Sequence, residues 1–388
     1  MKHLLSVLLL AAAFNGFAAD EDGFVPLFNG RDLTGWTNIN CAPETWSVRD
    51  GKIFCTGRPV GALRTTRHYE NFILEVEWRH LQSGGNSGVF IWGSPISAPG
   101  VPFLRGIEVQ VLDHGYATNY EKQHGKKSDW FTTHGDVFPI HGATMKPLGR
   151  HNGSRSFPSE DRSKGVNEWN HYRIVCNNGS LRLHVNGKEV SGGDDCNYRK
   201  GYLALESEGA PIEFRNLRIK ELPSGNPPPE LVAPLDPGWQ NLFTGLDFRG
   251  WRTNAATATR WVAGGRIGLK EGAPATQATL WTEKEYANAE FLFDCNPAKP
   301  AAGKDFVPPA VLLRGHNGEG AEVKLTSVTP GRNQRVTILI KGRDVVVSIN
   351  DKETQKLTLP ATTPARGAFG LRDTGAAMSL MNLHARDL

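Results

Sequence analysis

The sequence lacks the short motifs by which nucleotide-binding enzymes and serine hydrolases are recognised. It contains no phosphate-binding loop, no GxSxG elbow and no glycine-rich dinucleotide fingerprint. Cysteine is scarce, with five residues in 388 and no CxxC pair, which argues against a zinc ribbon. The formal net charge of +4 is spread along the chain rather than gathered in a basic arm. We therefore expect no nucleic-acid partner.

Long apolar runs are also scarce, and the one that stands out lies near the start of the sequence. Residues 4–14 are predominantly apolar, follow Lys2, and lead into small residues that end at Ala18 and Ala19. The run is too short to span a bilayer, and the pattern is typical of a secretory signal peptide over residues 1–19. We therefore predict cleavage near Ala18 or Ala19, a periplasmic or secreted protein, and no membrane span.

The five cysteines leave the disulfide pattern open. Export permits disulfides, but an odd number means that at least one thiol is free or pairs between chains. Cys41 with Cys55, and Cys176 with Cys196, are close in sequence and could pair. Buried reduced cysteines are an equally good interpretation, and spacing does not decide between the two.

Glycine and proline are abundant, with 43 and 24 residues, and they separate short runs in which apolar and polar residues alternate. Alternation with a period of two is typical of half-buried β-strands. A chain of 388 residues is also long enough for two domains. These features predict an all-β protein.

The clearest predicted strands lie between residues 71 and 113. Residues 73–79 and 107–111 each place acids, an amide or an arginine on one face and apolar side chains on the other. A turn containing Gly84 and Gly85 precedes a third strand, and such glycines permit positive φ or close approach of a ligand. A polar sheet face of this kind is typical of a sugar-binding β-sandwich and equally of an ordinary solvated sheet.

The sequence contains an internal repeat. Residues 28–36, FNGRDLTGW, recur as 243–251, FTGLDFRGW, and residues 200–217 match 366–383 at an offset of 166. Such self-similarity predicts two copies of one β-fold. A proline-rich stretch between them reads as an extended spacer. We predict a first domain over 20–222, a linker over 223–237 and a second domain over 238–388.

The two copies differ by a long insertion and by their polar residues. Asp113 and Trp169 are 56 positions apart, whereas the matching Ser327 and Asn333 are 6 apart, so the first copy carries about 50 extra residues, roughly 114–168. The second copy also replaces Glu206, Glu208 and other polar residues of the first. If there is one active site, we expect it in the first copy.

The sharpest chemical candidates are Glu108 and Asp113, with Gln110 between them. Alternation places Glu108 and Gln110 on one face, and a bend at the strand end could bring Asp113 beside them. Glycosidic chemistry usually needs two carboxyl groups, one protonated and one ionised. The alternative is a structural polar face, and the retention of Glu322 in the second copy favours an architectural role for Glu108.

Further candidates for substrate binding are Arg79, Asn86, Gln110, Trp92, Glu206 and Glu208. Asn86 follows two glycines and either binds sugar hydroxyls or serves as a turn residue. Arg79 either holds a substrate oxygen or pairs with the acids beside it. Glu206 and Glu208 share one face, either at the rim of a cleft or in solvent.

Histidines of the insertion could supply a general base or ligands for a divalent metal. His134 stands two residues before Asp136, and His141 follows in a similar glycine-flanked setting. Neutral imidazole near a carboxylate suits either role. The spacing matches no standard zinc pattern, so each is equally a loop residue that forms hydrogen bonds. We take His134 as the catalytic candidate, and no cofactor is established by the sequence.

Four motifs carry a resemblance to a known family. They are LFNGRDLTGW at 27–36, GNSGVF at 85–90, EVQVLD at 108–113 and FRN at 214–216. With them the chain resembles the domain-of-unknown-function 1080 family, now called 3-keto-disaccharide hydrolases. The match covers residues 24–222, and the second copy keeps mainly the opening and closing motifs, as a degenerate member would.

The resemblance implies an exported bacterial protein with two tandem concanavalin A-like jelly-roll β-sandwiches. It also implies cleavage of an oligosaccharide or 3-keto-glycoside by C2-proton abstraction, elimination and hydration, with Glu108, Asp113 and His134 as candidate catalysts. The alternative is a glycan-binding or cell-surface module without turnover. The second copy would then either bind glycan or pack on the first.

Overall fold

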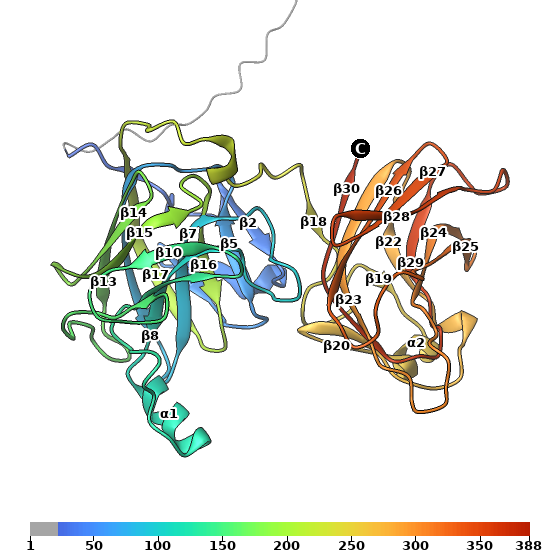
Figure 1. Cartoon of the computed structure of the whole chain (residues 1–388), viewed down its shortest axis with the longest axis horizontal. Helices are drawn as coiled ribbons and strands as arrows, with labels where there is room; N and C mark the ends of the chain where they lie inside the picture. Colours follow the sequence, from blue (N-terminus) through green and yellow to red (C-terminus); the bar gives the residue numbers. More distant parts are fainter. Residues whose placement is uncertain (1–21) are drawn as a thin grey trace, which may run out of the picture.

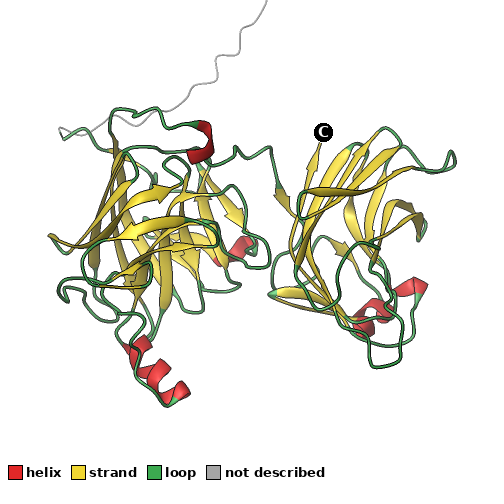
Figure 2. Cartoon of the chain, in the orientation of Figure 1, coloured by secondary structure: helices red, strands yellow, loops and turns green. Residues whose placement is uncertain are grey.

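The computed structural model describes residues 22–388, and the predicted signal peptide at 1–19 lies outside the described residues. The chain forms two β-sandwiches in tandem, each built of two antiparallel sheets (Figure 1). Strands dominate both halves, and helices are few and short (Figure 2). The prediction of two all-β jelly-roll sandwiches is confirmed. Over residues 22–388, no helix is both long enough and apolar enough to cross a bilayer.

The larger sheet of the first sandwich has nine strands, with β1 paired to β17 beside the main path. Its strands, in spatial order, are β10 (Thr144–Pro147), β15 (Lys188–Asn197), β14 (Ser180–Val185), β13 (Asn170–Asn177), β6 (Phe72–His80), β17 (Ile212–Glu221), β4 (Lys52–Cys55) and β3 (Trp46–Arg49), with β1 (Val25–Pro26).

The facing sheet has eight strands and carries most of the residues singled out from the sequence. Its order is β11 (His151–Asn152), β12 (Arg155–Ser156), β9 (Val137–Ile140), β8 (Gly106–Leu112), β7 (Asn86–Gly93), β16 (Tyr202–Ser207), β5 (Gly61–Thr65) and β2 (Trp36–Ile39).

The core of the first sandwich lies between these two sheets. Leu74, Val76 and Trp78 of β6 are buried, and Ile107 and Val109 of β8 meet them from the other sheet in one apolar cluster. Alternation along each strand therefore sends the apolar side chains inward and the polar ones to the outer faces. Burial of this apolar layer is the main favourable term in folding.

The second sandwich repeats this topology. Its larger sheet runs β20 (Trp261–Gly264), β21 (Arg266–Leu269), β30 (Met378–Asp387), β23 (Ala289–Pro297), β26 (Gln334–Lys341), β27 (Asp344–Ile349) and β28 (Lys352–Thr358), with β18 (Gln240–Asn241) on β30. The smaller sheet runs β19 (Trp251–Arg252), β22 (Leu280–Tyr286), β29 (Gly367–Leu371), β24 (Ala310–His316) and β25 (Glu319–Lys324). The two larger sheets have the same strand order: counted from β3 in the first and from β20 in the second, equivalent strands occupy equivalent positions.

The insertion of the first copy adds structure to one end of its sandwich. It contains the helix α1 (Gly115–His124), which projects from the end of β8 (Figure 1), together with β9 to β12. The strands β9, β12 and β11 extend the smaller sheet beyond β8, whereas β10 extends the larger one. The insertion therefore forms one wall beside the outer face of the smaller sheet.

The remaining helices are short: α2 (Ala255–Arg260) and the 3-10 turns η1 (Pro43–Thr45), η2 (Pro229–Leu231) and η3 (Thr276–Ala278). The segment around η2 hydrogen-bonds back to the first sandwich, with Arg199 N–H donating to the Leu231 carbonyl and Ala233 N–H to that of Lys200. Hydrogen bonds also join the two sandwiches. Gly100 N–H donates to Asp294 at 2.8 Å, and Asn382 Nδ2 donates to the Val101 carbonyl at 2.8 Å.

All five cysteines are buried and free in the structure. Burial raises the pKa of the Cys55 thiol to about 11 and that of Cys196 to about 12, so both remain protonated at neutral pH. Of the two interpretations of the cysteines, the structure therefore agrees with buried, reduced thiols.

Candidate functional site

A hollow of about 220 Å³ lies over the outer face of the smaller sheet in the first sandwich. Strands β7, β8 and β16 form its floor, and the insertion forms its wall. The residues that line it are Asn86, Phe103, Glu108, Gln110, Leu112, Tyr116, Trp130, Phe131, Phe138, Ile140, His141, Arg155, Glu206 and Glu208. Six candidates named from the sequence are among them, namely Asn86, Glu108, Gln110, His141, Glu206 and Glu208.

Strand register explains why the carboxyl groups gather here. Leu205 of β16 pairs with Val89 of the central strand β7, which places Glu206 opposite Gly88, while Glu108 of β8 pairs with Phe90 two residues further along the same face. A Cβ atom added to Gly88 would lie 2.9 Å from Glu108 Oε1 and 3.1 Å from Glu206 Oε2. Glycine at this position therefore leaves the space that two carboxyl groups occupy above one backbone segment.

The three glutamates have pKa values far above those of ordinary glutamates. Burial, together with the charge of Glu208, raises the pKa of Glu108 to about 8. Burial raises the pKa of Glu208 to about 7. Burial and the charges of Glu208 and Glu108 also raise the pKa of Glu206 well above that of an ordinary glutamate. At neutral pH the cluster therefore holds protonated and ionised carboxyl groups side by side.

Amide side chains position the cluster. Asn86 Nδ2 donates a hydrogen bond to Glu208 Oε2, and Asn86 Oδ1 accepts one from Gln110 Nε2 at 3.0 Å. Gln110 Nε2 also donates to the Ser87 carbonyl at 3.2 Å. Because an amide N–H favours the ionised form of a carboxyl group, Asn86 supports Glu208 as the carboxylate that ionises first.

Arg155 brings a positive charge to the hollow. Its Nη1 donates to Gln110 Oε1 at 3.3 Å and to Asp136 Oδ2 at 3.1 Å, and its guanidinium group stacks on Phe138 at 3.3 Å from the ring centroid. Asp136 is fully buried, and burial raises the pKa of this carboxyl. The pair therefore places a fixed cation beside Glu108 and Glu206, whose side chains are both buried.

Sequence reasoning missed Arg155, and it considered Asp136 only as a neighbour of His134. Arg155 stands on the two-residue strand β12, which pairs with β9 through Ser156 and Val137. No repeat or alternation marks so short a strand, because its counterpart is missing from the second copy. The only signal was the insertion itself, with its aromatic residues Tyr116 and Trp130, which do line the hollow.

Two predicted catalytic residues lie outside the hollow. Asp113 accepts hydrogen bonds from Gly84 N–H at 2.6 Å and Gly115 N–H at 2.9 Å, so it ties the glycine turn to the start of α1. His134 Nδ1 lies 2.9 Å from Asp161 Oδ1, and burial lowers the pKa of this imidazole. The expected bend that would bring Asp113 beside Glu108 is not present.

Two predicted substrate-binding residues also lie elsewhere. Arg79 is on the larger sheet, where its Nη2 is 2.7 Å from Glu213 Oε2 and its guanidinium group lies over the Trp169 ring. Trp92 is fully buried, and its indole N–H donates to the Glu70 carbonyl at 2.8 Å. Both side chains therefore serve packing and ion pairing on faces that the hollow does not reach.

One group of side chains in the insertion has the composition of a metal site. One ligand atom each from His114, His134 and Asp161 lie within 4.8 Å of one another. Ser163 Oγ connects them, at 2.7 Å from His114 Nε2 and 3.2 Å from His134 Nδ1. Two imidazoles and a carboxylate are ligands that suit a divalent transition metal. The same contacts also satisfy the side chains without an ion, and the divalent metal stays a prediction.

A model of the 3-keto-alpha-glucoside-1,2-lyase-like domain matches residues 23–220. The chain is similar to a curated 3-keto-disaccharide hydrolase of Bacteroides thetaiotaomicron, at 23% identity over 52% of this chain and 80% of that protein.

Two solved structures are similar at low TM-scores. One is a Parabacteroides distasonis protein assigned to the glycosyl hydrolases, with 23% identity and a TM-score of 0.42 over 54% of this chain and all of that one. The other is a carbohydrate-binding module, CBM66, of Bacillus subtilis, with 15% identity and a TM-score of 0.34 over 48% of this chain and 96% of that one. The family match covers half of the sequence and the whole of the first sandwich, so the chain belongs to the 3-keto-alpha-glucoside-1,2-lyase-like family.

Proposed function

We propose that the first sandwich cleaves the glycosidic bond of 3-keto-glycosides, 3-keto-disaccharides among them, by elimination followed by hydration. The observation that supports this reaction is the gathering of Glu108, Glu206 and Glu208 over one glycine, with pKa values raised to neutrality and above. A solvated sheet face would keep ordinary carboxylates. The membership of the family points to the same substrate class.

The reaction needs a base that removes the proton on C2 and an acid that protonates the oxygen leaving from C1. A ketone at C3 acidifies the proton on C2, so a base removes it and leaves an enolate. The electron pair then expels the oxygen on C1, which takes a proton from an acid, and a C1–C2 double bond conjugated to the ketone remains. Water adds back at C1 and a proton returns to C2, which completes a net hydrolysis.

We assign Glu208 as the base and Glu108 as the acid. The pKa of Glu208, about 7, leaves it partly ionised at neutral pH, and that of Glu108, about 8, leaves it mostly protonated. Carboxyl groups tuned in this way near the working pH are the efficient proton carriers. Glu206 is a third buried carboxyl group beside this pair, and burial raises its pKa well above that of an ordinary glutamate.

Arg155 is placed to stabilise the negative charge of the enolate. Its guanidinium group is already held by Gln110, Asp136 and Phe138, so it can face a developing oxyanion without reorganising. Aromatic side chains of the wall, Tyr116 and Trp130, offer apolar surface for the C–H face of a sugar ring.

The proposal is tested by incubating the protein with 3-keto-trehalose or a 3-keto-glucoside and following the released sugar or aglycone. We expect release by the wild type and by Glu322→Gln, a matched change at the equivalent position of the second sandwich. Glu108→Gln should slow release by about 10²-fold, the lower end of what a general acid contributes. A protein that binds these keto-sugars but releases nothing would instead be the glycan-binding module, and equal rates for all variants would place catalysis elsewhere.

Two further points belong to this proposal. Export rests on the leader-like pattern of residues 1–19, and the N-terminal sequence of the protein recovered from the native host tests it. We also propose that the second sandwich stays packed on the first, which is supported by the hydrogen bonds from Gly100 to Asp294 and from Asn382 to Val101. Small-angle scattering of the full chain should match the compact arrangement, and a profile of two independently moving bodies would contradict it.

A further inference from the structure

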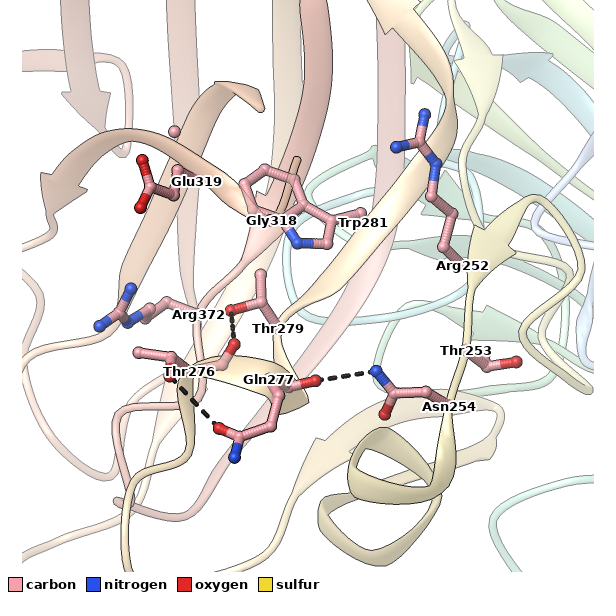
Figure 3. Close-up of a pocket in the computed structure, with 11 residues that line it drawn as sticks. Arg252, Thr253, Asn254, Thr276, Gln277, Thr279, Trp281, Gly318, Glu319 and Arg372 are labelled. Carbon is pink, nitrogen blue, oxygen red and sulfur yellow. Dashed lines mark hydrogen bonds between the residues drawn. The ribbon is translucent and has the colours of Figure 1, made fainter. Parts of the chain in front are cut away.

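A second and larger hollow, of about 900 Å³, lies over the smaller sheet of the second sandwich (Figure 3). Trp281 of β22 is at its centre, between Arg252 on one side and Arg372 with Glu319 on the other. Hydroxyl and amide side chains close its lower end, including Thr276 and Gln277. It combines an aromatic floor with a ring of polar groups, which is the usual composition of a ligand site.

This hollow occupies the face that corresponds to the candidate active site. Leu371 pairs with Val311 as Leu205 pairs with Val89, so the residue after each leucine occupies the same place in the two sheets. That residue is Glu206 in the first sandwich and Arg372 in the second. The position of Gly88 is taken by Ala310, which has a Cβ atom where the two carboxyl groups of the first sandwich meet. The second hollow has therefore lost the acid pair and gained a cation.

Arg372 is available to a ligand. Its guanidinium group makes no hydrogen bond or ion pair with any residue between 22 and 388, although its backbone N–H donates to the Ala310 carbonyl. By contrast, Arg260 of the same sandwich is held by Asp373 through Nε at 2.7 Å and Nη2 at 3.1 Å. Arg260 is thus fixed by a carboxylate, as structural arginines are. The side-chain donors of Arg372 are instead free to contact a ligand in the hollow.

The other side chains of the hollow are also only partly used. Arg252 Nη2 donates to the Glu283 carbonyl at 3.5 Å and is 3.7 Å from Glu285 Oε1, and both are long contacts of an exposed side chain. The Trp281 indole lies close against the sheet, because Gly315, Gly320 and Gly370 leave room for it. Cβ atoms added to these glycines would lie 1.9, 3.0 and 2.7 Å from the ring. Its Nε1 has no hydrogen-bond partner among the described residues, so one edge of the indole can meet a ligand.

We propose that this hollow binds a saccharide that carries an anionic substituent, a carboxylate or a sulfate, and does not cleave it. Arg372 supplies a planar fork of donors for the anion, with Arg252 as a second cation at the rim. The hydroxyl and amide groups around Thr276 and Gln277, together with the Glu319 carboxylate, match sugar hydroxyls. This inference adds a second site to the proposed function and does not depend on it.

Affinity gel electrophoresis of the full chain tests the inference with three soluble polymers. Polygalacturonate carries carboxylates, dextran sulfate carries sulfates, and dextran is neutral. We expect retardation by one or both of the anionic polymers, which identifies the substituent, and none by dextran. Retardation by dextran to the same degree, or by no polymer, would overturn the proposal.

Two charge reversals separate a built site from general attraction. Arg372→Glu restores the type of residue that the first sandwich has at this place, and we expect it to weaken binding at least tenfold. Arg266→Glu changes the same charge on β21 of the opposite sheet and should leave binding unchanged. Equal losses in the two variants would contradict the site. Binding that persists in Glu108→Gln would show that the second hollow acts independently of the first, whatever the keto-sugar assay gives.

Discussion

The two sandwiches present the same sheet face with opposite chemistry. In the first, Glu108 and Glu206 lie above Gly88, and burial raises the pKa of both carboxyl groups. In the second, the place of Glu206 belongs to Arg372, and Ala310 stands where Gly88 does. Of the three glutamates of the first hollow, Glu108 alone has a glutamate, Glu322, at the matching position of the second sandwich, and the Glu322 side chain is exposed.

This difference separates what the fold needs from what the chemistry needs. The inward-facing residues of both copies form equivalent apolar cores, so the architecture does not require acids on the outer face. A glutamate that is buried in one copy and exposed in the other gains its unusual pKa from the insertion that covers it. The insertion, with α1 and β9 to β12, is therefore the part that turns a sheet face into a site.

The largest effect is expected from Glu208→Gln. The variant removes the proposed base, and general acid–base catalysis contributes about 10²–10⁴-fold to rate. We expect the rate of keto-glycoside cleavage to fall by that factor, measured as product release at saturating substrate. Thr374 occupies the matching place in the second sandwich, and Thr374→Ala is the control that should leave the rate unchanged. A loss of less than about tenfold would remove Glu208 from the reaction.

The pH profile of cleavage should be bell-shaped. The base must be ionised, so activity should rise as pH increases toward the pKa of Glu208, about 7. The acid must be protonated, so activity should fall as pH passes the pKa of Glu108, about 8. Outside this window the rate should change about tenfold for each pH unit. A rate that rises steadily with pH, as for elimination by hydroxide in solution, would contradict the pair.

Glu108→Gln should also change stability, and the sign follows from the direction of the pKa shift. The pKa of Glu108 rises from 4.5 to about 8 on folding, so between these values the unfolded chain loses its proton first. Wild-type stability therefore falls as pH rises through this window, by at most about 1.4 kcal/mol per pH unit for one group. Glutamine does not titrate, so the variant should gain stability relative to wild type between pH 5 and 8, measured by denaturant unfolding.

A gain that is absent, or that appears at low pH, would mean that Glu108 is not buried as a neutral acid. Glu322→Gln provides the comparison at the same denaturant and pH.

Gly88→Ala tests the space in which the carboxyl groups meet. The new Cβ atom would lie 2.9 Å from Glu108 Oε1, so the two glutamates must move apart. Overpacking of this kind costs about 1–3 kcal/mol, and we expect a loss of activity along with it. Ala310→Gly, the reverse change in the second sandwich, should cost about 1 kcal/mol or less through backbone entropy and leave the activity alone. An active Gly88→Ala protein would show that the glutamates do not act together.

The fold and the strand residues of the site could be predicted from the sequence because regular strands leave a periodic pattern. Alternation with a period of two predicts that Glu108 and Gln110 share one face and that Glu206 and Glu208 share one face. All four side chains line the hollow. The repeat then located the insertion, because the second copy lacks it. Both signals are local or periodic, and both come from regular strands.

The remaining residues depend on contacts that no pattern records. Asp113 ends a strand as expected, but the N–H groups of Gly84 and Gly115 hold its carboxylate away from Glu108. Arg155 reaches the site only because β12 folds against β9, 45 positions along the chain from Gln110. Side chains from irregular segments find their partners through tertiary packing, and one sequence does not encode that in any spacing.

The smallest expected effect is that of Glu322→Gln on the stability of the second sandwich. The side chain is exposed and forms no hydrogen bond or ion pair with any residue in 22–388, so the change should stay within about 0.5 kcal/mol at every pH between 5 and 9. Unfolding of the full chain, followed by a probe in each sandwich, measures it. If Glu322→Gln unfolds its sandwich, the acid retained in both copies is architectural. The unusual pKa of Glu108 would then be a consequence of the fold rather than a device of the reaction.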